Sequence, residues 1–265
     1  MSTPQTWHYG LVSEWWAQFN VDGLEIEYYG RFVAAGQPAL DAGCGTGRLL
    51  VPWLRAGYDV DGADLSGDML ARCRERARAE GFEPLLLEQP LHELDPPRRY
   101  RTVVVCGVFG LGSTREQDEE ALWRLRGVLE PGGTLLLDHG VPYGSKGLWE
   151  LWTSEGRATL PQPFPEHGER KSATDGTEYE LRSRVVALDP LDESVLMELR
   201  VDKRCNGVPV ASDVHDLSMR MYLGEELRLL LGRAGFSHVE VRGGFSEREP
   251  TPDTKTLVYI ATRGA

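Results

Sequence analysis

The sequence has no apolar stretch long enough to cross a bilayer. Its longest uncharged stretch, from Thr102 to Thr114, has 13 residues, whereas a membrane-spanning helix needs about 20. No basic segment followed by an apolar block opens the chain, which argues against a secretory signal. The four cysteines lack CxxC spacing, which argues against a bound metal and a disulfide framework. These absences predict a cytoplasmic protein without a membrane partner.

Basic charge is also scarce. The 265 residues include 29 lysines and arginines against 41 acidic residues, giving a formal net charge of −12. Such a surface repels phosphate backbones and argues against a nucleic-acid partner. Arginine outnumbers lysine 25 to 4, which hints at a GC-rich bacterial genome. Hydrophobic residues make up 41% and charged residues 26%, both ordinary values for a globular protein of one or two domains.

Helical and strand patterns alternate along the first half of the chain. Apolar residues at helical spacing run from Trp7 to Asn20 and again from Leu24 to Val33. Short apolar strands are then expected at Pro38–Gly43, Val60–Leu65, Pro84–Leu87, Thr102–Cys106 and Thr134–Leu137. Charged helices are expected between them at Arg48–Ala56, Asp68–Glu80 and Glu116–Leu129. Apolar strands separated by helices predict a doubly wound α/β fold with a mostly parallel sheet.

The second half contains an antiparallel insertion. Three alternating segments lie between Thr177 and Tyr222, and Asn206-Gly207 is a strong hairpin signal. A helix (Glu225–Ala234) and two strands (Val239–Arg242, Leu257–Ala261) then resume the α/β pattern. We expect residues 1–36 to form helices that cover the site, and residues 37–140 with 223–265 to form the cofactor-binding core. Residues 141–222 would form an inserted antiparallel β-meander, either a substrate cover or a dimer surface.

One motif carries most of the chemical information. Asp41-Ala42-Gly43-Cys44-Gly45-Thr46-Gly47 follows a predicted strand and opens a helix, so a ligand can lie against backbone without side chains. Dinucleotide binding would require GxGxxG, but the third glycine would fall at Arg48 or Leu50. Asp64 ends the next strand, where a ribose diol would lie. The pattern predicts a nucleoside site without a pyrophosphate.

These motifs resemble the class I S-adenosylmethionine-dependent methyltransferases. Residues 41–47 are similar to their DxGxGxG motif, Asp64 to their ribose-binding acid, and residues 129–133 to their LxPGG turn. The resemblance covers residues 38–139 and 223–262. It implies a Rossmann-like sheet of seven strands, the last reversed, and S-adenosyl-L-methionine as cofactor. In this sequence Gln89 stands near the place of the usual adenine-binding Asp, so that contact would come from Gln89 or from backbone.

The resemblance also implies which residues contact the cofactor. They are Tyr9, Asp41, Gly43, Cys44, Gly45, Gly47, Asp64, Leu65, Gln89, Leu91 and Cys106. For Cys44 the alternative is a purely structural role between glycines, and for Tyr9 it is burial in a helix stripe. With its insertion and leading helices, the chain is similar to small-molecule enzymes such as glycine and sugar N-methyltransferases. The DNA-adenine methyltransferase signature is absent from residues 106–109.

Catalysis is expected to depend mainly on positioning, because a base is needed only for a protonated acceptor. His139, at the end of the fifth strand, is the candidate base, and Tyr143 is a weaker candidate. The histidine's alternative role is a hydrogen bond to a loop. Phe109, Trp149 and Trp152 are candidate substrate walls, whereas Trp15 and Trp16 are expected in the core or a dimer contact.

The sequence therefore predicts methyl transfer to a nitrogen or oxygen of a small-molecule acceptor. A homodimer is an open option for the assembly, with the inserted meander as its surface. Three alternatives remain open at this point. The protein could be a non-catalytic S-adenosylmethionine-binding regulator or a protein methyltransferase. A nicotinamide oxidoreductase is disfavoured by the glycine spacing.

Overall fold

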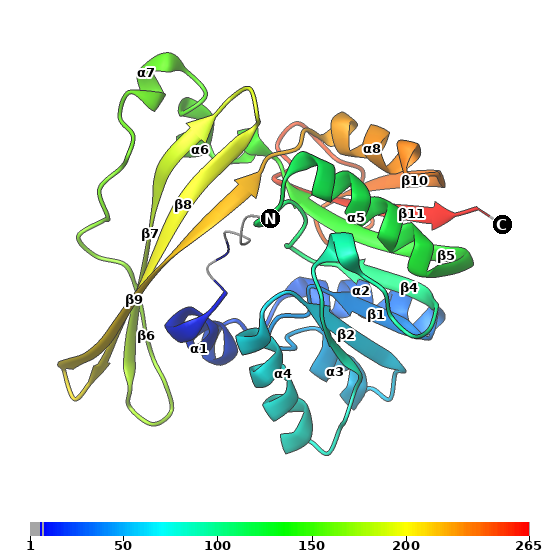
Figure 1. Cartoon of the computed structure of the whole chain (residues 1–265), viewed down its shortest axis with the longest axis horizontal. Coiled ribbons are helices and arrows are strands. Elements are labelled where there is room, and N and C mark those ends of the chain that lie inside the picture. Colours follow the sequence, from blue (N-terminus) through cyan, green and yellow to red (C-terminus); the bar gives the residue numbers. More distant parts are fainter. Residues whose placement is uncertain (1–5, 7, 265) are drawn as a thin grey trace.

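Two β-sheets organise the molecule in the computed structural model, which describes residue 6 and residues 8–264 (Figure 1). The strands of the larger sheet are β1 (Ala39–Ala42), β2 (Val60–Asp64), β3 (Leu86–Glu88), β4 (Tyr100–Val105), β5 (Leu129–Gly140), β10 (Phe236–Gly243) and β11 (Thr256–Arg263). Their order is β10-β11-β5-β4-β1-β2-β3, with β1 to β5 parallel and β11 antiparallel to both its neighbours. This arrangement confirms the predicted fold class and its reversed last strand.

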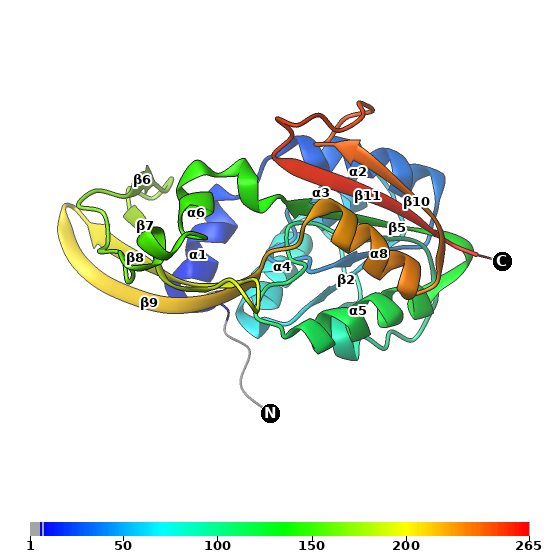
Figure 2. The ribbon, with the colours of Figure 1, turned by 90° about the horizontal axis from the view of Figure 1, so that it is seen from above.

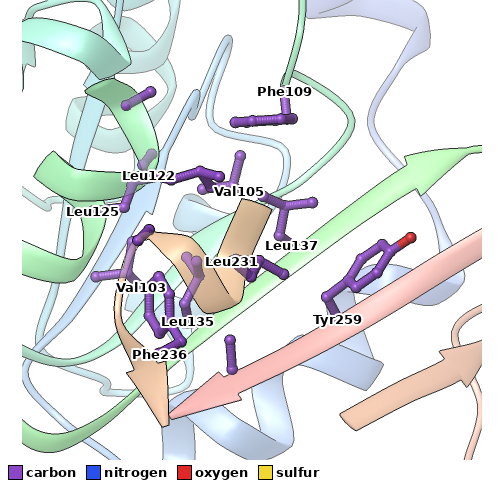
Figure 3. Packing of buried hydrophobic residues seen from close by; sticks show 14 of the residues in the cluster. Val103, Val105, Phe109, Leu122, Leu125, Leu135, Leu137, Leu231, Phe236 and Tyr259 are labelled. Carbon is purple, nitrogen blue, oxygen red and sulfur yellow. The ribbon is translucent and has the colours of Figure 1, made fainter. Parts of the chain in front are cut away.

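Helices cover both faces of the larger sheet. They are α2 (Leu24–Ala35), α3 (Leu50–Arg55) and α4 (Gly67–Ala79) on one face, and α5 (Arg115–Val128) and α8 (Gly224–Arg233) on the other. Val103 and Val105 of β4 pack under α5 and α8, whereas Val104 packs with the opposite cluster (Figure 3). All three are fully buried. Because side chains alternate along a strand, only an unbroken apolar run fills both layers.

The Pro131-Gly132-Gly133 segment interrupts the pairing of β4 and β5, as the sequence predicts. Tyr100 pairs with Leu129, but Thr102 pairs with Thr134, so the intervening residues of β5 leave the ladder. Gly132 has a φ of 73°, a conformation that glycine adopts without strain. The turn thus ends α5 and sets the register of β5.

The smaller sheet is antiparallel and lies between β5 and α8 in the chain. Its strands, in spatial order, are β6 (Glu169–Ser172), β7 (Glu178–Asp189), β8 (Ser194–Cys205) and β9 (Val208–Arg220). Asn206 and Gly207 have φ angles of 51° and 77° and join β8 to β9 as the predicted two-residue turn. β6 was not predicted, because its four residues are all polar and give no alternating signal.

Helix α1 (Gly10–Phe19) lies between the two sheets (Figures 1 and 2). Its Val12 and Trp15 pack against Leu199 and Val201 of the smaller sheet. The backbone N–H of Gly10 donates to the Asp68 carboxylate of α4 at 2.8 Å. α1 therefore connects the smaller sheet to the core.

Short helices occupy two irregular segments. They are η1 (Leu91–Glu93) after β3, and η2 (Pro142–Gly144), α6 (Lys146–Glu150) and α7 (Ser154–Arg157) after β5. Leu151 packs against Leu188 and Val195 of the smaller sheet, at the opposite end from α1. Within the described residues, no helix combines the length and the apolar character that a membrane span requires.

The fold predicts unequal costs for two leucine truncations. Leu136 of β5 is fully buried, whereas Leu191 is 95% exposed. We expect Leu136→Ala to lower the free energy of unfolding by about 2–5 kcal/mol, because it removes contacts and leaves a cavity. Leu191→Ala should change it by less than about 0.5 kcal/mol. Urea denaturation measures both values, and equal effects would contradict the assignment of Leu136 to the core.

Candidate active site

A cavity of about 380 Å³ lies at the carboxyl ends of β1, β2 and β4. Its walls come from the glycine loop after β1, the segment after β3, the loop after β4 and the start of α5. The segment around α1 and strands β8 and β9 close it from other sides. Ligands of open α/β sheets bind at this place, where neighbouring connections leave the sheet in opposite directions.

The three glycines of the loop after β1 differ in the space around them and in whether they line the cavity. All have positive φ angles, of 91°, 52° and 80° for Gly43, Gly45 and Gly47. A Cβ on Gly43 would lie 2.4 Å from the Val108 side chain, and one on Gly47 would lie 2.8 Å from the Cys73 sulfur. A Cβ on Gly45 would meet nothing within 4 Å. Gly43 and Gly45 line the cavity, whereas Gly47 lies outside its wall and packs closely against Cys73 of α4.

Asp64, at the end of β2, is bonded to the glycine loop. One carboxylate oxygen accepts the Gly45 N–H at 2.8 Å and the other accepts the Ser66 N–H at 2.8 Å. Burial raises the pKa of Asp64, and these backbone hydrogen bonds act in the opposite direction. Each carboxylate oxygen can accept a further hydrogen bond. Asp64 can therefore fix the loop and still receive two hydroxyls from a ligand.

Asp41 presents an unsatisfied charge to the cavity. It is 1% exposed, and among the described residues its Oδ2 atom has no hydrogen-bond partner. Burial raises the pKa of Asp41 to about 7, although the nearby Arg48 lowers it. An unpaired buried carboxylate is costly, so a cationic ligand group would stabilise this site.

Arg48 supplies the opposite charge to the same cavity. Its guanidinium pairs with Glu25 of α2, and Nη2 donates to the Cys106 sulfur at 3.7 Å. An arginine so held can still pair with a ligand carboxylate through its remaining donors. Asp41 and Arg48 together suit a ligand that carries an amino group and a carboxylate.

The segment after β3 lines the cavity as the sequence predicts, with Gln89 and Leu91. The side-chain oxygen of Gln89 accepts the Asp95 N–H at 3.0 Å, so this amide is oriented by its own loop. Its NH₂ group keeps both donors. Cys44, Leu65 and Cys106 also lie on the wall, in agreement with their predicted positions.

The amino-terminal segment contributes to the cavity wall, and the predicted Tyr9 is not part of that wall. Tyr9 is the residue before α1 and lies outside the wall, whereas His8 and Trp16 lie on it. The His8 carbonyl accepts the Ser66 hydroxyl at 2.5 Å. Burial and the charges of Asp64, Glu88 and Asp68 raise the pKa of Tyr9. Burial lowers the pKa of His8 to about 4. The imidazole is therefore neutral at pH 7 and does not repel a cationic ligand.

The structure does not bring the two candidate bases to the cavity. His139 is buried beside Tyr222, and its Nε2 accepts the Tyr222 N–H at 3.0 Å. Burial lowers the pKa of His139 to about 4. Neither His139 nor Tyr143 belongs to the wall. The expectation that His139 faces the crevice is corrected here, because its side of β5 faces α5 and α8; the hydrogen-bonding alternative matches its position.

The predicted substrate walls also lie elsewhere. Phe109 is buried against Tyr222, and Trp152 packs against the smaller sheet. Trp149 and Tyr143 contact each other edge to face, 46% and 45% exposed. None of these four side chains lines the cavity. Apolar character alone did not distinguish a cavity wall from a core or a surface cluster.

Another part of the cavity wall comes from the smaller sheet, for which the sequence predicts either a substrate cover or a dimer surface without naming individual wall residues. Met197, Leu217 and Met219 line the cavity from β8 and β9. α1 covers one end of this sheet face and residues 148–160 cover the other, so the middle of the face remains open to the cavity. The alternation of β8 predicts an apolar face, but not which of its residues would stay uncovered.

The loop after β4 joins this wall to the core. Gly112 N–H donates to the Ser218 carbonyl at 2.7 Å, and Arg220 N–H donates to the Gly110 carbonyl at 2.8 Å. Between them, Leu111 forms a β-bridge with Met219. The loop that borders the cofactor end of the cavity is therefore continuous with strand β9.

Comparison with known protein families supports the predicted identity of this site. Residues 39–133 match the family described as a methyltransferase domain. They span the glycine loop, Asp64 and the Pro-Gly-Gly turn within the strand order reported above. Residues 39–133 therefore carry a methyltransferase domain. The predicted family, cofactor and enzymatic nature are thereby confirmed.

Individual relatives resemble this chain over different lengths. A malonyl-[acyl-carrier protein] O-methyltransferase of Pectobacterium atrosepticum is 34% identical over 101 residues, 38% of either chain. An S-adenosylmethionine-dependent methyltransferase from Clostridium acetobutylicum has a TM-score of 0.73 at 16% identity, covering 96% of this chain and 98% of the other. The sugar N-methyltransferase KedS8 from Streptoalloteichus sp. has a TM-score of 0.66 at 18% identity, covering 100% and 99%. These two structures share the fold.

The residues present fit S-adenosylmethionine. The cofactor combines a ribose diol, a sulfonium and an amino-acid end with both charges. Asp64 offers acceptors for the diol, and the unpartnered Asp41 oxygen offers a counter-charge for a cation. Arg48 offers donors for a carboxylate, and the open space at Gly45 allows close approach to backbone.

The role of Asp64 can be tested with a matched pair of variants. We expect Asp64→Asn to weaken S-adenosylhomocysteine binding by roughly 10- to 100-fold, because charge-assisted hydrogen bonds contribute about 1.5–3 kcal/mol. Asp253→Asn removes the same charge at an exposed position outside the wall, between β10 and β11, and should change affinity by less than about threefold. Calorimetry measures both. Wild-type affinity in Asp64→Asn would contradict the assignment.

Asp41 predicts a pH dependence of cofactor binding. A bound cation favours the ionised carboxylate, whereas burial raises the pKa of Asp41 to about 7 in the free protein. Binding must therefore displace a proton below pH 7. S-adenosylmethionine affinity should fall on the order of tenfold between pH 7 and pH 5.5, while the ligand's own amino group stays protonated. Asp41→Asn should bind more weakly with a flatter pH profile, and a wild-type profile that is flat would exclude this role.

Proposed function

We propose that this enzyme transfers a methyl group to a nitrogen or oxygen of a small-molecule acceptor by direct in-line displacement. The observation that carries the proposal is one continuous cavity. It runs from the glycine loop, past Cys106 and Val108 after β4, to Met197 and Met219 of the smaller sheet. A donor at the glycine loop and an acceptor against the methionines would share this space.

The wall favours a small acceptor over a macromolecule. The segment around α1, the loop after β4, the start of α5 and strands β8 and β9 surround the cavity. We infer that residues 1–36 and 141–222 cover the acceptor, as their predicted domain roles suggest. A net charge of −12 disfavours nucleic acid.

The proposal includes both nitrogen and oxygen as acceptor atoms, because similar proteins are named for methyl transfer to one or to the other. KedS8 is described as a sugar N-methyltransferase and the Pectobacterium protein as an O-methyltransferase. Between them these names support transfer to nitrogen or oxygen. The choice for this chain depends on the acceptor end of its own cavity.

The chain's residues would act mainly by positioning. Bound S-adenosylmethionine supplies a methyl group on a cationic sulfur, which is already a good leaving group. Asp64 and the glycine loop hold the donor, and the neutral His8 avoids opposing its charge. The methionine wall excludes water and aligns the acceptor. Holding the reactants in line is the main catalytic requirement, and a neutral amine would need no base.

The proposal predicts that the acceptor end can be blocked without loss of the donor site. Met219→Trp places a bulky ring in the cavity, whereas Val214→Trp changes an exposed residue of the same strand. With S-adenosylmethionine and a panel of small amines and alcohols, we expect wild-type enzyme to release S-adenosylhomocysteine. Met219→Trp should lower this turnover at least tenfold, with donor affinity within about threefold of wild type, because poor alignment slows transfer. Val214→Trp should match wild type.

Two results would contradict the proposal. Donor binding without turnover on any small acceptor, combined with methylation of added proteins, would support a protein methyltransferase. Unchanged turnover in a folded Met219→Trp variant would place the acceptor elsewhere. Circular dichroism melting of each variant shows whether it is folded.

A further inference from the structure

We propose that the acceptor end of the cavity selects a cationic amino group, and that Asp118 is the anion that binds it. This inference rests on the proposed function and narrows its acceptor class. It is carried by the position of Asp118, by the pairing of the charges around it, and by the apolar wall that it adjoins.

Asp118 is a buried carboxylate on the cavity wall. It lies in the first turn of α5 and is 3% exposed. One oxygen accepts the Ser113 hydroxyl at 2.5 Å and the other accepts the Tyr222 hydroxyl at 2.6 Å. Ser113 belongs to the loop bonded to β9, and Tyr222 follows β9. Asp118 therefore lies where α5 meets the acceptor-side wall.

The cations near Asp118 are engaged by other acids. Arg115 pairs with Glu193 and Glu226, both at 2.6 Å. Arg220 pairs with Asp192 at 3.0 Å. Two arginines thus face three other carboxylates, and Asp118 is held by neutral hydroxyls. Burial raises the pKa of Asp118, whereas the two hydroxyl bonds and the charges of Arg220 and Arg115 act in the opposite direction. The two arginines make their direct ion pairs with the other acids.

The charges of the whole wall lead to the same conclusion. The acidic side chains on the wall are Asp41, Asp64 and Asp118, and the one arginine there is Arg48. Arg48 already pairs with Glu25. S-adenosylmethionine has two positive groups and one negative group, a net charge of one. With the donor bound, the wall therefore stays negative, and Asp118 is the acid that the donor contacts do not use.

The neighbouring wall defines the rest of the acceptor. Leu111 and Met219 adjoin Asp118 through the loop and strand described above, and Met197 and Leu217 continue the surface. Methionine side chains are flexible and polarizable, so they adapt to ligands of irregular shape. An acceptor with an ammonium group on an apolar body satisfies both the carboxylate and this wall. Where that nitrogen is the one methylated, it first gives its proton to the Asp118 carboxylate, because an ammonium has no lone pair with which to attack the methyl group.

The test uses two probes of matched shape, 2-phenylethylammonium and 2-phenylethanol. Each is titrated into the enzyme saturated with S-adenosylhomocysteine, and binding is followed by calorimetry and ligand-observed NMR. We expect wild-type enzyme to bind the ammonium at least tenfold more tightly than the alcohol. Asp118→Asn should reduce this preference to less than threefold and leave S-adenosylhomocysteine affinity within threefold of wild type.

Glu116→Gln is the matched control. It removes the same charge from the same helical turn at an exposed position outside the wall, so the preference for ammonium should persist. Equal binding of both probes by wild-type enzyme would overturn the inference without any variant. So would an unchanged preference in folded Asp118→Asn. Absence of S-adenosylhomocysteine binding would contradict the proposed function itself, which separates the two failures.

Discussion

The site depends on the carboxylate of Asp64, which bonds three separate pieces of backbone into one surface. Asp64 itself ends β2, its two oxygens hold the loop after β1 and the start of α4, and Ser66 in turn holds the His8 carbonyl. Strand order brings these pieces together, but it does not fix their spacing. A glycine loop is free to adopt many conformations, so this acid supplies the constraint that makes it a binding surface.

The proposed donor and acceptor ends are built from different parts of the chain. The donor end uses the ends of parallel strands, where backbone and a few carboxylates do most of the binding. The acceptor end uses side chains from an antiparallel sheet that reaches the core through the loop after β4. Asp138 supports that loop from beneath, since its carboxylate accepts the Tyr29 hydroxyl at 2.7 Å and the Gly107 N–H at 3.1 Å.

Most of the fold and the donor end could be predicted from the sequence, because local patterns encode them. Each of these patterns determines the structure of residues close to it in the sequence. They are the unbroken apolar strands, the glycine motif and the Asn206-Gly207 turn. The direction of a single side chain is harder to predict. Asp138 and His139 are adjacent in β5 but face opposite layers, so a correct strand placed His139 wrongly. Met197 and Asp118 reach the cavity through contacts between distant segments, which no local pattern encodes.

Under the proposed function, the separate origin of the acceptor wall has an evolutionary consequence. Met197, Leu217 and Met219 are carried by a sheet that enters the chain between β5 and α8. Their replacement alters the room available to an incoming molecule, while the acids and glycines that hold the donor stay untouched. Substitutions in this segment can therefore change which acceptor the enzyme binds without changing its methyl donor. In this architecture the acceptor specificity can change while the binding site for the methyl donor stays the same.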